Sequence, residues 1–314
     1  MWDLLIIIIP AAIAYTMPLL MGALGGLYSE RSGVTNLCIE GLMLFGCFAS
    51  AATIVKLQAT GMNANAAIAI GIVVAMLASA LLSLLHAVAS INLKADQTIS
   101  GTAINMLSTA LSLFLAQTIT GSGNITVKRA IIRSSVPVLS RIPVIGPLFF
   151  SDSYWTTWLC LAVWGLSYFL LYKTSFGLRL RACGEHPSAV ASAGVNVHKM
   201  RYIGVIASGL LSGLGGACIL VTYAGEYNSG SGINGLGFLA IAALIFGQWK
   251  PLGILGSTMF FGLCMTVANI GRILPAFSSV PMAVLGAFPY LATLVALIFS
   301  SKKSSAPLAS GQPF

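Results

Sequence analysis

The chain has 314 residues, of which 57% are hydrophobic and only 7% are charged, and its mean hydropathy is +0.94. A soluble domain carries about a quarter charged residues, so this composition excludes an ordinary soluble protein and predicts an all-α polytopic membrane protein. The net charge is +9, but the basic residues lie at the ends of apolar runs, where they set topology and attract anionic lipid headgroups. We therefore expect membrane lipids as partners and no nucleic acid.

Apolar runs long enough to cross a bilayer as helices follow one another along the chain, since about twenty residues span the hydrocarbon core. They are 4–28, 34–55, 64–93, 98–120, 154–172, 201–223, 252–269 and 282–300. A further run, 237–249, is shorter and follows a Gly- and Asn-rich stretch, which is typical of a broken helix. We expect about eight to ten transmembrane helices in one domain over 1–300, followed by a tail over 301–314.

Basic residues predict the orientation of these helices. The segment 173–201 is the most basic polar stretch between two apolar runs, and Glu185 is its only acidic residue. Its basic residues are Lys173, Arg179, Arg181, Lys199 and Arg201. The positive-inside rule therefore places this segment in the cytoplasm, the N-terminus outside, and the C-terminus with the tail 301–314 inside. The loop 121–153 is also basic but falls outside, as long loops follow the rule poorly.

A short sequence similarity within the chain, the internal similarity, is compatible with an inverted repeat. Residues 32–34 lead to a Phe-Gly pair at 45–46, and residues 231–233 lead to another at 246–247. In the predicted topology the first segment enters the membrane from the inside and the second from the outside. That opposite entry is the arrangement of an inverted repeat.

Polar residues within the apolar runs mark a candidate pathway. Asn36 and Glu40 lie four apart, hence on one face of a predicted helix. Small and polar residues recur every three to four positions in the run 98–120 and form a stripe; they are Thr98, Gly101, Asn105, Ser108 and Ser112. Such a stripe is typical of a water-filled path and, equally, of polar packing between helices. Glu40 is costly unless paired or wetted, so it either lines a pathway or caps a neighbouring broken helix.

Small residues also recur every four positions in the run 201–223. They are Gly204, Ser208, Ser212 and Gly216. This pattern lets helices approach closely, so we interpret it as packing.

The cytoplasmic segment carries signals for one short helix. Pro187 favours a first helical position, Gly194 favours the residue just past the end, and Glu185 suits the positive helix N-terminus. The stretch 187–193 is small-sided and too short to span a bilayer. It is typical of an ordinary loop helix or of a plug that docks into a groove of another protein.

Motifs for catalysis, metal binding and ATP binding are missing from the sequence. There is no HExxH motif and no Gly-Lys-Ser/Thr phosphate loop. The six cysteines are scattered without a CxxC pair and the three histidines stand alone. We expect no enzyme activity, no metal site and no cofactor bound by this chain. If transport uses ATP, a separate subunit must bind it.

Four stretches, in order, resemble the permease subunits of ATP-binding cassette importers, in the branch shared by ribose-type sugar, branched-chain amino-acid and nucleoside systems. They are ERSGVTNLCIEGLMLFG (30–46), HAVASINLKADQTISGTAIN (86–105), FGLRLRACGEHPSAVASAGVNVHKMR (176–201) and GFLAIAALIFGQWKPLG (237–253). The ERSG start and the FGQWKPLG ending look most like the shorter of two permeases in nucleoside importers. Those importers work with a substrate-binding lipoprotein of the basic membrane protein family.

The resemblance implies alternating access in a prokaryotic plasma (inner) membrane. The short helix would sit in a cleft of an ATPase subunit and move as a lever when ATP closes the ATPase dimer. Implied partners are that ATPase, a second permease chain and an external binding lipoprotein. The residues expected to couple to the ATPase are Arg179, Arg181, Gly184, Glu185, Pro187, Ala191 and Gly194. The residues expected in the translocation pathway are Asn36, Glu40, Thr98, Asn105, Ser108 and Ser112.

Three functions are compatible with the sequence. The first is a permease for nucleosides, and the second is a permease of the same branch for simple sugars or branched-chain amino acids. The third is an ion-driven secondary carrier with Glu40 as its titrating group and backbone carbonyls near Asn234 as a sodium site. The carrier leaves the cytoplasmic segment unexplained, and the low charge of the polar stripe suits a neutral solute better than an ion.

Overall fold

The computed structural model describes residues 2–128, 131, 140, 142–143, 146–151, 153–230, 232–270, 281–300 and 306–314. Outside these residues lie parts of the predicted loop 121–153, the first residues of the tail 301–314, and Ser231 of the internal similarity.

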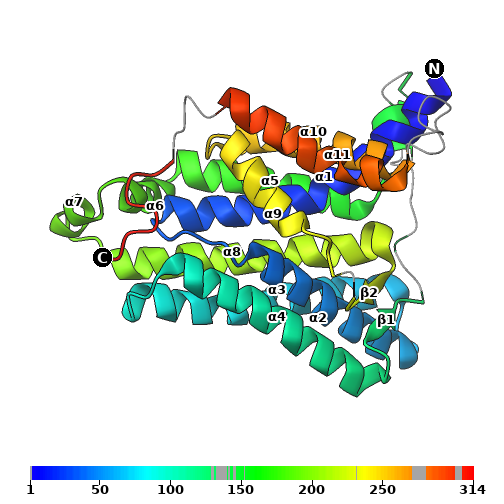
Figure 1. The fold of residues 1–314 in the computed structure, drawn as a ribbon, viewed down its shortest axis with the longest axis horizontal. Coiled ribbons are helices and arrows are strands. Elements are labelled where there is room, and N and C mark those ends of the chain that lie inside the picture. Colours follow the sequence, from blue (N-terminus) through cyan, green and yellow to red (C-terminus); the bar gives the residue numbers. More distant parts are fainter. Residues whose placement is uncertain are drawn as a thin grey trace.

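The described chain is a bundle of helices with one short hairpin (Figure 1). The helices are α1 (Trp2–Arg31), α2 (Ile39–Ala59), α3 (Ala64–Ala87), α4 (Gln97–Thr120), α5 (Trp155–Lys173), α6 (Ser175–Glu185), α7 (Pro187–Ser192), α8 (Val197–Ile219), α9 (Leu236–Phe246), α10 (Pro251–Ile270) and α11 (Met282–Ser300). Strands β1 (Asn124–Thr126) and β2 (Glu226–Asn228) pair antiparallel. Short π-helical turns extend α3 over Val88–Asn92 and α8 over Leu220–Ala224, and a third covers Gly146–Phe150.

The predicted class is confirmed. Seven helices within the described residues are long and apolar enough to cross a membrane, namely α1, α2, α3, α4, α5, α8 and α10. Two shorter apolar helices, Leu236–Phe246 and Val284–Leu294, fall in the predicted runs 237–249 and 282–300. The chain is therefore an all-α multi-pass membrane protein.

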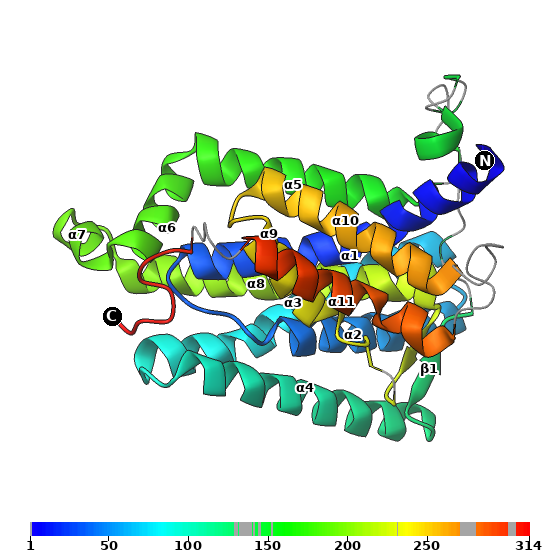
Figure 2. The same cartoon turned by 45° about the horizontal axis from the view of Figure 1, so that its top comes forward.

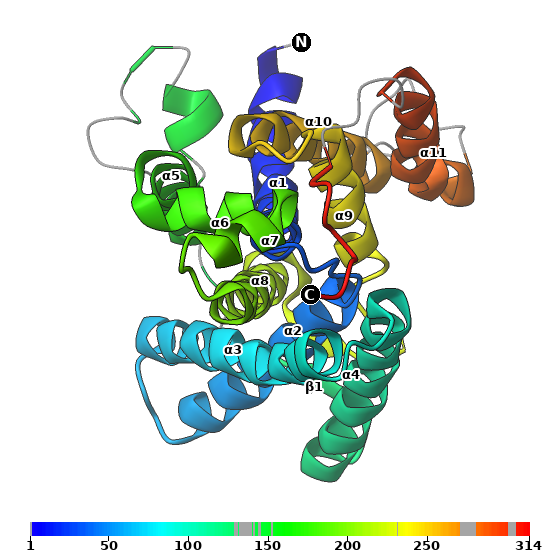
Figure 3. The ribbon, with the colours of Figure 1, turned by 90° about the vertical axis from the view of Figure 1, so that its left-hand side faces the viewer.

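The bundle is built around α1 and α8. Helix α8 packs on α1, α2 and α3, while α1 also packs on α5, α9 and α10 (Figure 3). The small residues of α8 make this possible: a Cβ on Gly216 would lie 1.9 Å from the Met43 carbonyl oxygen, and one on Gly213 would lie 2.5 Å from that of Ala75. The packing interpretation of the small-residue pattern is confirmed.

Two ends of the bundle can be distinguished (Figures 1 and 2). We call the end that carries α6, α7 and the C-terminus the loop end, and the end that carries β1, β2 and the N-terminus the hairpin end. The termini thus lie at opposite ends, as the predicted topology requires. Which end faces the cytoplasm stays a prediction.

The segment between α1 and α2 corrects one expectation. Residues 32–38 are not helical, so Asn36 and Glu40 do not share a helix face. Gly33 has a φ of +95°, which ends α1, and the Asn36 side-chain oxygen accepts from the Cys38 N–H at 3.0 Å. This local turn competes with helix formation, so α2 begins only at Ile39. We call residues 32–38 the α1–α2 linker.

Candidate functional site

Helices α6 and α7 project from the loop end as two consecutive short helices. The predicted short helix is confirmed: α7 begins at Pro187 and ends at Ser192, and Gly194 follows with a φ of +79°. The preceding helix α6 was missed. Its signal was Thr174, whose side chain accepts from the Gly177 N–H at 3.2 Å, an ordinary N-cap.

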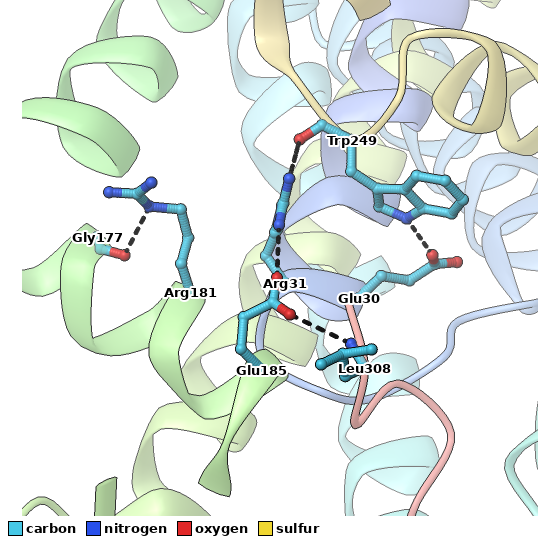
Figure 4. A network of polar contacts seen from close by, with 7 residues as sticks. All are labelled: Glu30, Arg31, Gly177, Arg181, Glu185, Trp249 and Leu308. Carbon is cyan, nitrogen blue, oxygen red and sulfur yellow. Dashed lines mark hydrogen bonds and ion pairs between the residues drawn. The ribbon is translucent and has the colours of Figure 1, made fainter. Parts of the chain in front are cut away.

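A salt bridge joins α6 to α1 (Figure 4). The guanidinium of Arg31 lies 3.1 Å from the carboxylate of Glu185, and it also donates to the carbonyl oxygen of Trp249 at 2.9 and 3.2 Å. The indole N–H of Trp249 donates in turn to the buried carboxylate of Glu30. Glu185 therefore binds the α6–α7 unit to α1, and Arg31 binds α1 to the α9–α10 turn.

Close backbone approach fixes the same unit. A Cβ on Gly184 would lie 2.5 Å from the Arg31 carbonyl oxygen, and one on Gly177 would lie 2.2 Å from that of Leu170. Only glycine fits at either position without displacing backbone. Both ends of α6 therefore lie in close contact with the backbone of α1 and α5.

The predicted coupling residues divide into three groups. Arg179 is exposed, whereas Arg181 is half-buried with its guanidinium 4.4 Å from the centre of the Tyr172 ring. Gly184 and Glu185 attach α6 to α1, as described above. Pro187, Ala191 and Gly194 shape α7, with Ala191 and Gly194 exposed.

An open groove of about 370 Å³ runs along α6 and α7. It is almost entirely apolar and is lined by Leu178, Arg179, Ala182, Glu185, His186, Ala189, Val190, Ala193 and Val195. An apolar groove with charged residues at its rim, on a helix pair outside the bundle, can receive part of another protein.

A second cluster lies where α2 and α9 begin. Glu40, in the first turn of α2, accepts from the N–H groups of Gly235 and Gly237 at 3.0 and 2.6 Å. It therefore caps the start of α9, and the capping interpretation is confirmed. Helix α2 runs from here to the hairpin end, where Lys56 and Ile125 line one cavity, whereas α9 runs to Trp249 at the loop end. The two helices thus start side by side and diverge in opposite directions.

Asn36 and Asn105 complete this cluster. The side chain of Asn105 accepts from the Gly41 N–H and donates to the Leu37 carbonyl oxygen, both at 2.8 Å. Asn36 donates to the Ser208 hydroxyl at 2.7 Å, which ties the linker to α8. We call the group Asn36, Glu40, Asn105, Gly235 and Gly237 the helix-start cluster. Its polar groups bind backbone that the broken helices leave without helical partners.

The polar stripe of α4 is only partly as expected. Ser108 and Ser112 are buried, and Ser112 accepts from the Tyr227 hydroxyl at 2.9 Å. Thr98 is exposed and lies outside the buried stripe. The position that faces the linker is Gln97, whose side-chain oxygen accepts from the Thr35 N–H at 2.7 Å. The spacing of 97, 101, 105, 108 and 112 could have identified it.

Comparison with known proteins identifies the family. The family described as branched-chain amino acid transport system / permease component matches residues 8–298. This chain belongs to that family.

Individual relatives of this permease cover almost its whole length. It is 44% identical over 313 residues to the guanosine ABC transporter permease protein NupQ of Bacillus subtilis, covering 99% of this chain and 97% of the relative. It is 39% identical to the nucleoside ABC transporter permease protein NupC of Lactococcus lactis, over 97% and 95% of the two chains. A putative glucose ABC transporter permease protein, TsgC13 of Haloferax volcanii, is 29% identical over 90% and 88%.

The family match covers most of the elements described here. It extends from α1 into α11, so the α6–α7 unit and the helix-start cluster both belong to the permease domain. A permease component carries solute across a membrane and is not normally an enzyme. The roles of individual residues in coupling and in the pathway stay predictions.

Proposed function

We propose that this chain is the membrane-spanning permease of an ATP-driven importer for nucleosides. Residues 1–300 form the permease domain, with the N-terminus outside. Segment 173–201 and tail 301–314 lie in the cytoplasm of a prokaryotic cell, and loop 121–153 lies outside. The relatives named for guanosine and nucleosides, matched over nearly their whole length, support this substrate class.

One observation carries the coupling mechanism. The exposed α6–α7 unit is joined to the bundle by the Arg31–Glu185 salt bridge, and Arg31 also holds the turn that ends α9. The other end of α9 is capped by Glu40 of α2. Pressure from an ATPase on α7 therefore reaches the start of α2 and α9 through these contacts.

ATP is bound by a separate ATPase subunit, because this chain has no phosphate-binding loop. The groove along α6 and α7 receives that subunit. The importer also contains a second permease chain and an external binding lipoprotein, as the resemblance to the shorter of two nucleoside permeases implies.

The helix-start cluster suits a neutral substrate. The polar side chains that meet there include the neutral Asn36, Asn105 and Ser208, and Glu40 is engaged by backbone N–H groups. A pathway beside groups of such low net charge suits a neutral solute, which is bound weakly and can leave again. A sugar is the second candidate, because the relative TsgC13 is named as a putative glucose permease.

Reconstitution tests the proposal. The chain is placed in liposomes with its co-encoded ATPase, second permease and binding protein, and ATP hydrolysis is measured with purine and pyrimidine nucleosides, ribose, glucose and leucine. We expect stimulation by nucleosides alone, and none when this chain is omitted. Stimulation by glucose, ribose or leucine instead would change the substrate class. Uptake that collapses with the ion gradient while ATP remains would favour the ion-driven carrier.

A further inference from the structure

The end of the chain lies across the loop end as an ordered strip. We call residues 306–314 the tail segment (Figures 1 and 3). On one side it binds the last turn of α6: the Ala309 N–H donates to the Gly184 carbonyl oxygen at 2.8 Å, and the Leu308 N–H donates to the Glu185 carboxylate at 3.4 Å. The tail segment therefore contacts the same two residues that join α6 to α1.

Its other contacts are with the α1–α2 linker and with α8. The hydroxyls of Ser310 and Thr35 lie 3.1 Å apart, and Arg201 of α8 donates to the Gln312 carbonyl oxygen at 2.9 Å. The Phe314 ring lies 5.9 Å from the Arg201 guanidinium. One strip thus connects α6 and α8 to the α1–α2 linker, which is far from both in the sequence.

Thr35 is the point where this strip meets the membrane-embedded part of the protein. Its N–H donates to Gln97 of α4, and its carbonyl oxygen lies 3.1 Å from the His86 ring of α3. The next residue is Asn36 of the helix-start cluster. The tail segment therefore links the α6–α7 unit to the loop-end side of that cluster.

Arg201 is poorly satisfied beneath the tail segment. Its side chain is only 1% exposed, yet its Nε and one Nη atom have no hydrogen-bond partner among the described residues. A buried guanidinium without full hydrogen bonding carries a desolvation cost. The unpartnered Nε and Nη2 atoms lie beside Gly33 of the α1–α2 linker, so movement of the linker away from α8 would give these N–H groups access to water or to an anion.

The tail segment is also weakly held. Of its residues only Pro307 and Ala309 are buried, and Leu308 is 67% exposed. Few buried apolar groups and few hydrogen bonds are the marks of a segment that opens at low free-energy cost. The tail segment is thus held mainly by four polar contacts to the rest of the protein, with little apolar burial to oppose its release.

We propose that the tail segment is a displaceable clasp. When bound it holds α6 against the α1–α2 linker and α8 and closes the loop end; during the transport cycle it leaves Arg201 and Thr35, so that the linker moves relative to α6 while α6 stays joined to α1. The clasp rests on the proposed function, because the ATPase acting on α6 and α7 drives its release.

A reversible cross-link tests the clasp. The neighbouring hydroxyls of Thr35 and Ser310 bring these positions within reach of a disulfide. We would reconstitute Thr35→Cys/Ser310→Cys with its partners, oxidise it with copper phenanthroline, and confirm the bond by peptide mass spectrometry. We expect nucleoside uptake to fall at least about tenfold on oxidation, because a gating step is blocked, and to recover with dithiothreitol.

Controls separate the clasp from other effects. The single variants, Thr35→Cys and Ser310→Cys, retain all six native cysteines, including the buried Cys160–Cys218 pair at 3.7 Å, and should be insensitive to the oxidant. Full uptake by the oxidised, cross-linked double variant would overturn the clasp alone. Failure of the cross-link to form would overturn the placement on which it rests. A wild-type complex without nucleoside-stimulated hydrolysis would overturn the proposed function and the clasp with it.

Discussion

Arg31 and Glu185 are 154 positions apart in the sequence, and their side chains form a 3.1 Å salt bridge at the loop end. Arg31 adds two hydrogen bonds to the Trp249 carbonyl oxygen, so one guanidinium holds α1, α6 and the α9–α10 turn together. Its side chain is 11% exposed and that of Glu185 is 39% exposed. Arg31 is therefore more buried and makes more hydrogen bonds than Glu185, so substitutions at the two positions should reduce stability by different amounts.

Replacing Arg31 should cost more stability than replacing Glu185. Arg31→Gln removes the ion pair and leaves the Trp249 carbonyl oxygen without its two hydrogen bonds. We expect the free energy of unfolding to fall by about 2 kcal/mol. Glu185→Gln keeps the hydrogen bonds from Arg31 to Trp249 and removes only the salt bridge. A partly exposed salt bridge contributes about 1 kcal/mol or less to stability. Thermal unfolding in detergent of both variants and of the double variant measures the coupling. Equal shifts for the two single variants would contradict the arrangement.

Glu40→Gln should weaken the start of α9. The amide keeps one acceptor for two backbone N–H groups, so we expect a loss of about 1 to 2 kcal/mol, as for a missing N-cap. Glu226→Gln is the matched control, because that carboxylate is exposed on β2. Loss of uptake at unchanged thermal stability would instead place Glu40 in the pathway.

Charge reversal should have different effects at the two arginines of α6, Arg179 and Arg181. Arg179→Glu changes an exposed residue at the groove, so we expect loss of substrate-stimulated ATP hydrolysis with little change in stability. Arg181→Glu also removes the contact with the Tyr172 ring, so a stability loss of about 1 kcal/mol should accompany it. Co-purification with the ATPase and thermal unfolding distinguish the two. Normal stimulation in Arg179→Glu would reject the role of the groove.

Gly194 should tolerate alanine but not proline. Its φ of +79° costs an L-residue about 1 kcal/mol, and no atom lies within 4 Å of an added Cβ. Proline cannot reach this φ and removes the N–H that donates to Ala191 at 2.9 Å. We expect substrate-stimulated hydrolysis to persist in Gly194→Ala and to disappear in Gly194→Pro, with both proteins inserted. Equal ATP hydrolysis by Gly194→Ala and Gly194→Pro would show that coupling does not require the positive φ and the N–H group at the end of α7.

Gly216→Ala should disrupt the bundle, because the new Cβ would lie 1.9 Å from the Met43 carbonyl oxygen and force α8 away from α2. The cost should be several kcal/mol, about the upper range for overpacking. Gly165→Ala on α5 is the matched control, since no atom lies within 4 Å of its Cβ. Yield of folded protein on size-exclusion chromatography measures both. A normal yield for Gly216→Ala would contradict the close approach.

The thiol of Cys183 should react slowly. Burial raises its pKa above the usual range, although the Arg201 guanidinium opposes this. A raised pKa leaves less thiolate at neutral pH, so maleimide labelling of a variant that keeps only this cysteine should accelerate as pH rises toward that pKa. Deleting the tail segment should raise the rate by uncovering Arg201 and α6. An unchanged rate would show that the tail segment does not shield this site.

Much of the secondary structure and helix packing of this protein could be predicted from the sequence, because local chemistry determines these features. Run lengths and hydropathy gave the membrane helices, since a bilayer accepts only helices of a certain length. Pro187 and Gly194 gave both ends of α7, because their backbone preferences act without neighbours. The four-residue spacing of small groups in α8 likewise predicted close packing, which depends only on side-chain size.

The tertiary structure decided everything that depends on partners distant in the sequence. Glu40 was equally suited to a pathway and to a cap until Gly235 and Gly237 were found beside it. Glu30, Arg31 and Trp249 lie in motifs of the family resemblance, but no local pattern showed that they meet, because a salt bridge or buried hydrogen bond is defined by two groups and their separation. The same holds for the tail segment: nothing in residues 306–314 indicates that they lie on Arg201, since that contact exists only after the bundle has formed.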